Sequence, residues 1–253
     1  MIEKIRKQLE VYSDPLFKFD PIPHIYTYDG EVYESVTTFL KQFHIPFDKN
    51  RAEGIALKLG VSKEEVLKMW EDKANYAGML GTEVHEWIEY YYNKKWKKLP
   101  QNPEVIDRID KFNRIHNSKL YKLTNIANEV RIFSKKWKLA GTIDALFIYN
   151  NKLFIIDYKT NKELTTQNNF GEYLLPPFDK YDKCHLHEYS IQLSLYSLIL
   201  KEQGIETSGG YLVHLGPSDE GKIYNCVDMR NELLQYFNEK EEVFLQVPYN
   251  DNI

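Results

Sequence analysis

Alternating polar and apolar residues in the middle of the chain predict a β-hairpin. The segment 140–160 is rich in β-branched and aromatic side chains, and Asn150-Asn151 divides it in the manner of a turn. A hairpin that turns there pairs residues whose numbers sum to 301, so we expect Asp144 directly opposite Asp157. Side chains alternate between the two faces of a strand, so Lys159 projects to the same face as Asp157.

Hydrophobic spacing elsewhere predicts helices and further strands around this hairpin. Helices are expected over residues 35–40, 62–92, 104–118, 188–201 and 229–246. Strands are expected as a small hairpin at 26–33, between 128 and 160, at 210–215 and at 222–227, with a long loop over 161–183. The second helix is expected to break near Gly78 or Gly81. This order predicts one α/β domain with a central mixed β-sheet flanked by helices.

Composition and charge are those of a soluble globular protein. The 253 residues are 43% hydrophobic, carry a net charge of −4, and contain no apolar stretch of the roughly 18 residues that span a bilayer. The N-terminus lacks the apolar core of a signal peptide, so we expect a cytoplasmic protein with no membrane partner. The net charge argues against a histone-like attraction to nucleic acid, and residues 94–98 would form either a local basic strip or an ordinary solvated loop. Only Cys184 and Cys226 occur, too few for a four-cysteine iron–sulfur cluster.

The two opposed carboxylates of the hairpin are the main chemical signal. Directly opposite strand residues have Cβ atoms roughly 4.5–5.5 Å apart, where like charges destabilise a sheet. A hydrophobic hairpin that keeps both Asp144 and Asp157 therefore needs a compensating cation. Mg²⁺ or Mn²⁺ suits such oxygen ligands, and Lys159 would lie beside the ion.

Residues that precede the hairpin offer further ligands. His85 and Glu89 are four apart and share one face of a predicted helix, where His85 would add a nitrogen ligand and Glu89 is either its partner or a surface charge. Glu129 begins the strand before the hairpin. A turn near residues 135–136 gives pair numbers that sum to 271, so Glu129 is expected to face Thr142 as an outer metal ligand or to hold a water.

Two polar residues share a face of the helix predicted at 188–201. Gln192 and Tyr196 are four apart, with leucine and isoleucine residues around them. An amide and a phenol on the side of the metal site would bind the scissile phosphate. The alternative is a tyrosine at the edge of the core beside an ordinary glutamine.

These motifs follow one order along the chain. They are Gly81-Thr82-x-x-His85 with Glu89, Glu129, Gly141-Thr142-Ile143-Asp144, Asp157-Tyr158-Lys159, and Gln192-x-x-x-Tyr196. Together they resemble the PD-(D/E)XK nuclease superfamily, in particular its RecB-like exonuclease branch. Residues 33–40 are also similar to the entry segment of mitochondrial genome maintenance exonuclease and related phage nucleases.

The resemblance implies a fold and a set of roles. It implies one nuclease domain over 1–253, with an N-terminal hairpin and helices at 1–80 and a restriction-endonuclease-like core at 81–246. The implied metal ligands are His85, Asp144, Asp157 and the Tyr158 carbonyl, with Lys159 as the catalytic lysine and Gln192 and Tyr196 as supporting residues. Helicase-linked relatives often carry an iron–sulfur cluster, which this chain cannot bind, and it lacks a Walker A motif, so any motor would come from a helicase or recombination partner.

The function predicted from these residues is metal-dependent cleavage of DNA. The leading hypothesis is an exonuclease that uses Mg²⁺ or Mn²⁺ on single-stranded or end-containing DNA, in recombination, repair or phage DNA processing, and leaves a 5′-phosphate and a 3′-hydroxyl. The first alternative is a structure-specific or sequence-specific endonuclease. The second is a nucleic-acid-binding protein that keeps the fold without turnover.

Overall fold

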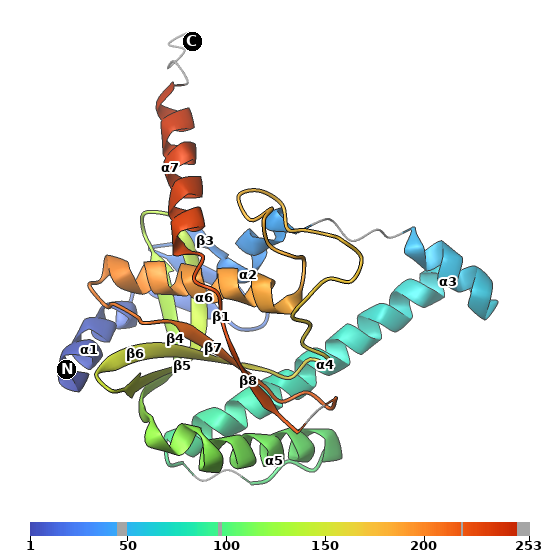
Figure 1. Ribbon diagram of the computed structural model, residues 1–253, viewed down its shortest axis with the longest axis horizontal. Coiled ribbons are helices and arrows are strands. Elements are labelled where there is room, and N and C mark those ends of the chain that lie inside the picture. The colour runs from blue at the N-terminus through green and yellow to red at the C-terminus, as the bar shows by residue number, and fades with distance from the viewer. Residues whose placement is uncertain (45–49, 96–97, 219, 247–253) are drawn as a thin grey trace.

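An eight-stranded mixed sheet forms the centre of the computed structural model, which describes residues 1–44, 50–95, 98–218 and 220–246 (Figure 1). The strands are β1 (Phe17–Asp20), β2 (Ile25–Tyr28), β3 (Glu31–Ser35), β4 (Thr124–Ser134), β5 (Leu139–Tyr149), β6 (Lys152–Lys159), β7 (Gly210–His214) and β8 (Lys222–Asn225). The helices are α1 (Ile2–Leu9), α2 (Val36–Phe39), α3 (Arg51–Leu59), α4 (Lys63–Tyr92), α5 (Pro103–Ser118), α6 (His185–Glu202) and α7 (Arg230–Gln246). The predicted class, a mixed sheet flanked by helices, is confirmed.

The sheet forks at β5. The strand order is β1-β2-β3-β5-β6-β7-β8, and β4 pairs with the other edge of β5. Strand β3 pairs with β5 only at residues 139–140, in parallel, whereas β6 pairs with it antiparallel from Ala145 onward. Both use the edge of β5 opposite β4, so the pairing leaves that edge open over residues 141–144. This fork is the point at which Asp144 lies.

Helices cover both faces of the sheet. The side chains of β6 alternate, so Ile155 contacts the core beneath α6 while Ile156 contacts the core formed with α4 and α5. Helix α6 is buried along residues 190–200. Burying a large aliphatic side chain contributes roughly 1.5–3 kcal/mol, so these two cores hold α4 and α6 against the strands that carry the candidate site.

Helix α4 is long and unbroken, so the predicted break near Gly78 or Gly81 is wrong. It begins at a capping box, in which Ser62 accepts from the Glu65 amide and the Glu65 carboxylate accepts from the Ser62 amide. At Gly81 a Cβ atom would lie 3.1 Å from Thr160 Oγ1, so the glycine serves close approach of the helix to β6. Residues 71–79 are exposed, and the N-terminal half of α4 extends away from the sheet to α3 (Figure 1).

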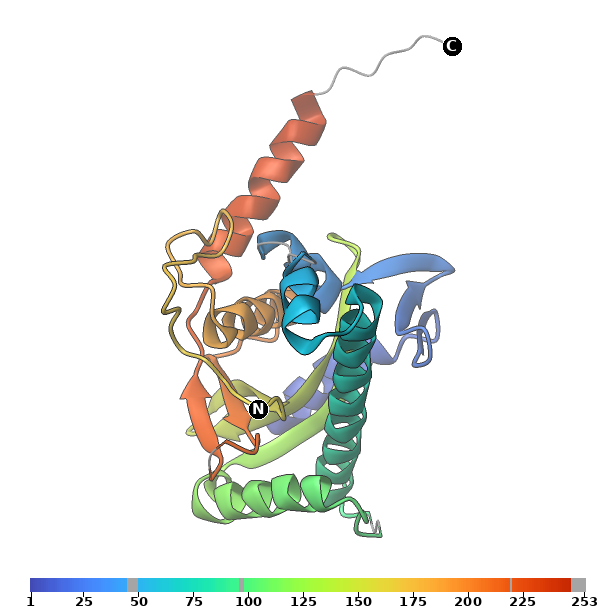
Figure 2. The ribbon, with the colours of Figure 1, turned by 90° about the vertical axis from the view of Figure 1, so that its right-hand side faces the viewer.

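Strand β1 and helices α1 and α3 were not predicted from the sequence. The hairpin predicted at 26–33 is present as β2 and β3, and β1 adds a third antiparallel strand to it. The three-stranded unit stands beside α4 (Figure 2).

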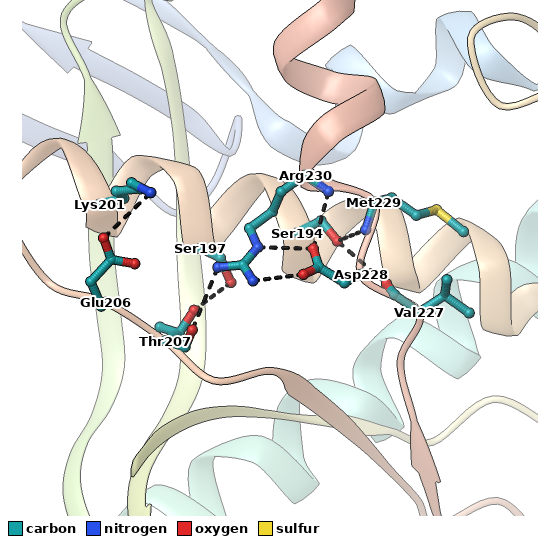
Figure 3. A network of polar contacts seen from close by, with 9 residues as sticks. All are labelled: Ser194, Ser197, Lys201, Glu206, Thr207, Val227, Asp228, Met229 and Arg230. Atoms are coloured by element: carbon teal, nitrogen blue, oxygen red, sulfur yellow. Dashed lines mark hydrogen bonds and ion pairs between the residues drawn. The ribbon is translucent and has the colours of Figure 1, made fainter. Parts of the chain in front are cut away.

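Serine side chains on α6 fix the chain where it enters α7 (Figure 3). Ser194 Oγ accepts from the Met229 amide at 2.9 Å and donates to the Val227 carbonyl at 3.4 Å. Arg230 binds Asp228 through two nitrogens, at 2.8 and 2.6 Å. Helix α7 then extends away from the sheet (Figures 1 and 2). Among the described residues no helix is long and apolar enough to cross a membrane.

Candidate active site

The predicted hairpin register is confirmed, and the two strands separate where their carboxylates lie. Ala145 pairs with Ile156, as the sum of 301 requires, and the antiparallel ladder ends at that pair. The Tyr158 amide donates instead to Asp144 Oδ2 at 2.7 Å. A side-chain carboxylate thus replaces the next backbone acceptor and holds Asp144 in the fork.

Helix α4 brings His85 to the same point. Its Nε2 lies 2.9 Å from the Tyr158 carbonyl oxygen, and its Nδ1 lies 3.5 Å from Asp144 Oδ2. The same Nδ1 is 3.9 Å from Glu129 Oε1. Ligand atoms of His85, Glu129 and Asp144 all lie within 4.8 Å of one another. Three elements, α4, β4 and β5, therefore converge on one small volume.

The predicted register of Glu129 is wrong by two residues. Val130 pairs with Ile143, so pair numbers sum to 273 and Glu129 lies across from Asp144, not from Thr142. The cause is the turn, which spans four residues between Ser134 and Leu139 and is centred later than expected. A shift of two keeps the side chain on the same face of the sheet, so Glu129 still reaches the predicted site.

Asp157 and Lys159 form an ion pair next to this group. Lys159 Nζ lies 2.7 Å from Asp157 Oδ2, and the two side chains are 17% and 5% exposed. Lys159 also donates to Gln192 Oε1 at 3.3 Å, and Gln192 Nε2 donates to the Tyr196 hydroxyl at 3.0 Å. The predicted side-by-side placement of Gln192 and Tyr196 on α6 is thus present, and it is linked to the lysine. Among the described residues, the three-residue ligand group does not include Asp157.

Burial and mutual electrostatics shift the pKa values of His85, Glu129, Asp144 and Asp157. Burial disfavours charge on His85, but the carboxylates of Asp144 and Glu129 outweigh it and raise the pKa of His85 to about 9. Burial and repulsion by Asp144 raise the pKa of Glu129 to about 7. Burial, offset in part by Lys159, raises the pKa of Asp157 to about 6. Burial raises the pKa of Asp144, but His85 outweighs it and leaves that pKa below its ordinary value.

The lysine is held in its charged form. Burial lowers the pKa of Lys159, yet the carboxylates of Asp157 and Asp144 outweigh burial and leave that pKa above its ordinary value. The Lys159 ammonium also lies 4.1 Å from the centre of the Tyr189 ring. Lys159 is therefore an ammonium at neutral pH, suited to orienting or to stabilising negative charge.

The donor set fits a divalent metal ion. Carboxylate and carbonyl oxygens with one imidazole nitrogen are ligands that Mg²⁺ and Mn²⁺ accept. Adjacent ligands around a small octahedral ion with bonds of about 2.1 Å lie about 3 Å apart, and His85 Nδ1 lies 3.5 Å from Asp144 Oδ2. The residues that could hold an ion are His85, Glu129, Asp144 and Tyr158, with Asp157 beside them.

Further residues of α4 and of the segment after it lie near the metal-ligand group or pack elsewhere. Glu89 lines a cleft beside His85, as its place on α4 predicted. Tyr92 packs against Phe112 of α5 and belongs to the core, whereas Tyr91 contacts the same ring and stays 38% exposed. In the basic stretch 94–98, residues 96–97 lie outside the described residues.

Sequence reasoning missed two aromatic residues at this cleft. Phe19 and His24, from the hairpin of β1 and β2, line it opposite α4. The alternating Phe17 and Phe19 were the available signal, because period-two aromatic positions indicate a strand.

A family model described as the PD-(D/E)XK nuclease superfamily matches residues 64–250. The chain belongs to this superfamily. In this PD-(D/E)XK chain, Asp157-Tyr158-Lys159 has the residue pattern of the letters (D/E)XK. This tripeptide and Asp144 lie at the fork between β5 and β6.

The individual proteins that are similar to this PD-(D/E)XK chain have low sequence identity to it. RecB, a subunit of the RecBCD enzyme from Buchnera aphidicola subsp. Baizongia pistaciae, is 28% identical over 80 residues, which is 32% of this chain and 6% of RecB. The crystal structure of a "putative exonuclease" from Eubacterium rectale has a TM-score of 0.45 at 13% identity, covering 85% of this chain and 80% of that one. The crystal structure of SSO0001 has a TM-score of 0.32 at 13% identity, covering 96% and 85%. At these TM-scores the two structures add no evidence for fold or activity.

Proposed function

We propose that this chain is a divalent-metal-dependent DNA exonuclease that hydrolyses phosphodiester bonds in single-stranded or end-containing DNA. Membership of a nuclease superfamily supports hydrolysis of nucleic acid. The observation that carries the proposal is the fork of β5 and β6, where His85, Glu129 and Asp144 converge beside Lys159. The short match to RecB supports a role in recombination or repair, with phage DNA processing as a further setting, and a helicase as partner.

The proposed metal ligands are His85, Glu129, Asp144, Asp157 and the Tyr158 carbonyl, and Mg²⁺ or Mn²⁺ suits them. When bound, such an ion polarises the scissile phosphate and lowers the pKa of water. Asp144 already accepts from the Tyr158 amide, so its carboxylate is oriented before any ion arrives. The Tyr158 carbonyl is oriented likewise, because it contacts His85.

Lys159 is the proposed catalytic lysine. As an ammonium it donates hydrogen bonds to oxygens of the phosphate and stabilises the negative charge that develops on them. It is not the base, because the neighbouring carboxylates keep it protonated. Gln192 and Tyr196 are proposed as positioning residues, since they form a hydrogen-bonded chain that ends on the Lys159 ammonium.

The domain organisation remains a proposal. The family match begins at residue 64, within α4, and so includes the N-terminal part of that helix. We propose one nuclease domain for 1–253, with the three-stranded hairpin unit and first helices of 1–80 as an extension of the core at 81–246.

Cleavage of 5′-labelled linear single-stranded DNA and of circular single-stranded DNA tests the proposed function. Each DNA is incubated with Mg²⁺, with Mn²⁺ and with EDTA, and an RNA of the same sequence is run in parallel. The variants are Lys159→Ala at the site and Lys152→Ala as a matched control, since Lys152 is an exposed lysine at the other end of β6. Metal-dependent loss of only the linear DNA, abolished by Lys159→Ala and kept by Lys152→Ala, is the expected result.

Other outcomes would redirect the proposal. Cleavage of the circular DNA would indicate an endonuclease. Equal activity of Lys159→Ala and the wild-type protein would contradict the catalytic role of the lysine. Binding without cleavage under every condition would favour the non-catalytic alternative.

A further inference from the structure

A pair of aromatic side chains stands beside the proposed metal centre. Phe19 of β1 stacks on Tyr26 of β2, with ring centres 4.6 Å apart and planes at 28°. His24, in the turn between these strands, meets the Phe19 ring edge-on at 5.0 Å. Tyr26 is buried and shares a hydrogen bond of 3.0 Å with Thr142 on β5. The aromatic pair, Phe19 and His24, is therefore attached to the strand that carries Asp144, two residues from it.

The aromatic pair forms one wall of a cleft that reaches the proposed metal ligands. The cleft has a volume of about 350 Å³, within the range of small-ligand sites. Thr82 and Glu86 of α4 line it opposite the aromatic pair, and His85 and Glu129 line it as well. Because His85 and Glu129 belong to the metal-ligand group, a group bound in the cleft would lie next to a phosphate at that centre.

The lining of the cleft suits a nucleobase better than a phosphate. Glu86, Glu89 and Glu129 contribute carboxylates, which repel phosphate oxygens and accept hydrogen bonds from amino groups of bases. Aromatic side chains stack on bases of any sequence, because every base has a π face. His24 is exposed, so its ring adds little to the hydrophobic core and is accessible to a ligand.

Arg131 lies near the Phe19 ring and lines a second cavity. This cavity, of about 560 Å³, is also lined by Phe19 and Glu129, so the two cavities are adjacent, and it includes Arg6 and Arg131. The Arg131 guanidinium lies 5.0 Å from the centre of the Phe19 ring, and the residue is exposed. Positive charge is therefore available for the backbone of a strand whose base occupies the first cavity.

We propose that the exposed His24 ring, supported edge-on by Phe19, forms a stacking subsite for one unpaired nucleobase of the substrate strand, next to the phosphate at the metal centre. The inference rests on the proposed function and adds to it a specific recognition element: the enzyme holds a base that is not in a duplex. A base in a duplex is stacked and paired, so occupying the subsite requires a single strand or a frayed end.

Binding of short single-stranded oligonucleotides tests the subsite. All proteins carry Lys159→Ala and are measured with Mg²⁺, so that the strand is held and not cut. One set of oligonucleotides carries 2-aminopurine at successive positions from the end, and a second carries an abasic site at the same positions. The substitutions are Phe19→Leu, which keeps an apolar side chain, and His24→Asn, because asparagine tolerates the positive φ of 53° at this position. Ile22→Ser, in the same turn and 95% exposed, is the matched control.

The proposal predicts one position at which 2-aminopurine fluorescence is quenched on binding. Removing the base at that position should weaken binding by about 5- to 160-fold. Phe19→Leu and His24→Asn should each remove the quenching and weaken binding of the intact strand, with little further effect on the abasic strand. The Ile22→Ser variant should bind the intact and the abasic strand with the same affinity as the protein that carries Lys159→Ala alone.

Two results would overturn the subsite. The first is unchanged binding and quenching in both variants, and the second is an equal loss for intact and abasic strands, which would indicate a structural role of the hairpin. Either can occur while the cleavage experiment succeeds, so the subsite alone would fail. A wild-type protein that neither cuts nor binds nucleic acid would instead contradict the proposed function, and the subsite with it.

Discussion

Gly141 on β5 packs directly against Tyr196 of α6. A Cβ atom there would lie 2.7 Å from Tyr196 Cε1 and 3.1 Å from the Tyr196 hydroxyl oxygen. Carbon atoms do not approach to 2.7 Å, so Gly141→Ala must displace the tyrosine ring, which is only 2% exposed. Overpacking a core costs about 1–3 kcal/mol, and loss of the hydrogen bond between Gln192 and Tyr196 adds about 1 kcal/mol. At about 2–4 °C per kcal/mol for a chain of this size, the Tm should fall by roughly 4–16 °C.

The same substitution should reduce cleavage well below the Tm. A displaced Tyr196 no longer holds Gln192, whose Oε1 accepts from the Lys159 ammonium. Small misplacements of a reacting group cost up to about 100-fold in rate, so we expect kcat to fall by about 10- to 100-fold. Calorimetry gives the Tm, and cleavage of linear single-stranded DNA at saturating substrate gives kcat.

Gly210→Ala, on strand β7, is a matched control that crowds the same helix, α6. A Cβ atom at Gly210 would lie 2.5 Å from Leu193 Cδ2, so this variant also overpacks against α6. Leu193 is apolar and has no hydrogen bond to Lys159, so stability should fall while kcat stays near that of the wild-type protein. Equal losses of kcat in both variants would show that α6 acts through stability alone. A wild-type Tm for Gly141→Ala would refute the packing argument itself.

Three further predictions concern charge, metal and helix capping. In EDTA, the free energy of unfolding should fall as the pH rises from about 5 to 9. Glu129 and Asp157, with pKa values of about 7 and 6, keep protons in the folded chain that the unfolded chain has lost. His85, with a pKa of about 9, loses its stabilising charge at the upper end of this range. Urea unfolding across this range checks the sign, and a rise in stability would contradict it. Mg²⁺ or Mn²⁺ at about 100 times its Kd should stabilise the wild-type protein by about 2.7 kcal/mol, which raises the Tm. In the Asp144→Asn variant, a thermal melt should show that most of this rise in Tm is lost. An undiminished rise would place the ion elsewhere. Ser62→Ala should cost about 1 kcal/mol in unfolding experiments without changing cleavage, because the capping box lies at the end of α4 remote from His85; a change in kcat would refute that separation.

The hairpin of β5 and β6 could be predicted because its turn is encoded locally. Asn150 and Asn151 both adopt positive φ, 47° and 58°, a conformation that asparagine tolerates and that two-residue hairpin turns require. With the turn in place, the register follows up to the pair of Ala145 and Ile156, which lies next to Asp144 and Asp157. Turn chemistry, strand alternation and the motif pattern all indicate the same hairpin.

The register of β4 could not be predicted in the same way. Its turn spans residues 135–138, a run of lysines and one tryptophan without a strong two-residue turn signal. Glu129 itself adopts a φ of 48°, a local distortion that no hydrophobic pattern reveals. The error was two residues, which preserves the face, so Glu129 reached the predicted neighbourhood although its predicted partner was wrong.

The fork of the sheet explains how two opposed carboxylates are tolerated before any ion binds. A continuous ladder would place Asp144 and Asp157 as a like-charged pair, and the structure ends the ladder at the pair before them. Each carboxylate then has its own cationic partner, His85 for Asp144 and Lys159 for Asp157. The proposed function uses the same two partners differently: once these carboxylates hold an ion, His85 serves as a ligand, and the Lys159 ammonium is available to the phosphate. The groups that stabilise the metal-free fold are therefore the groups that the chemistry requires, which is why the site should be both metal-dependent and sensitive to any change that moves Lys159.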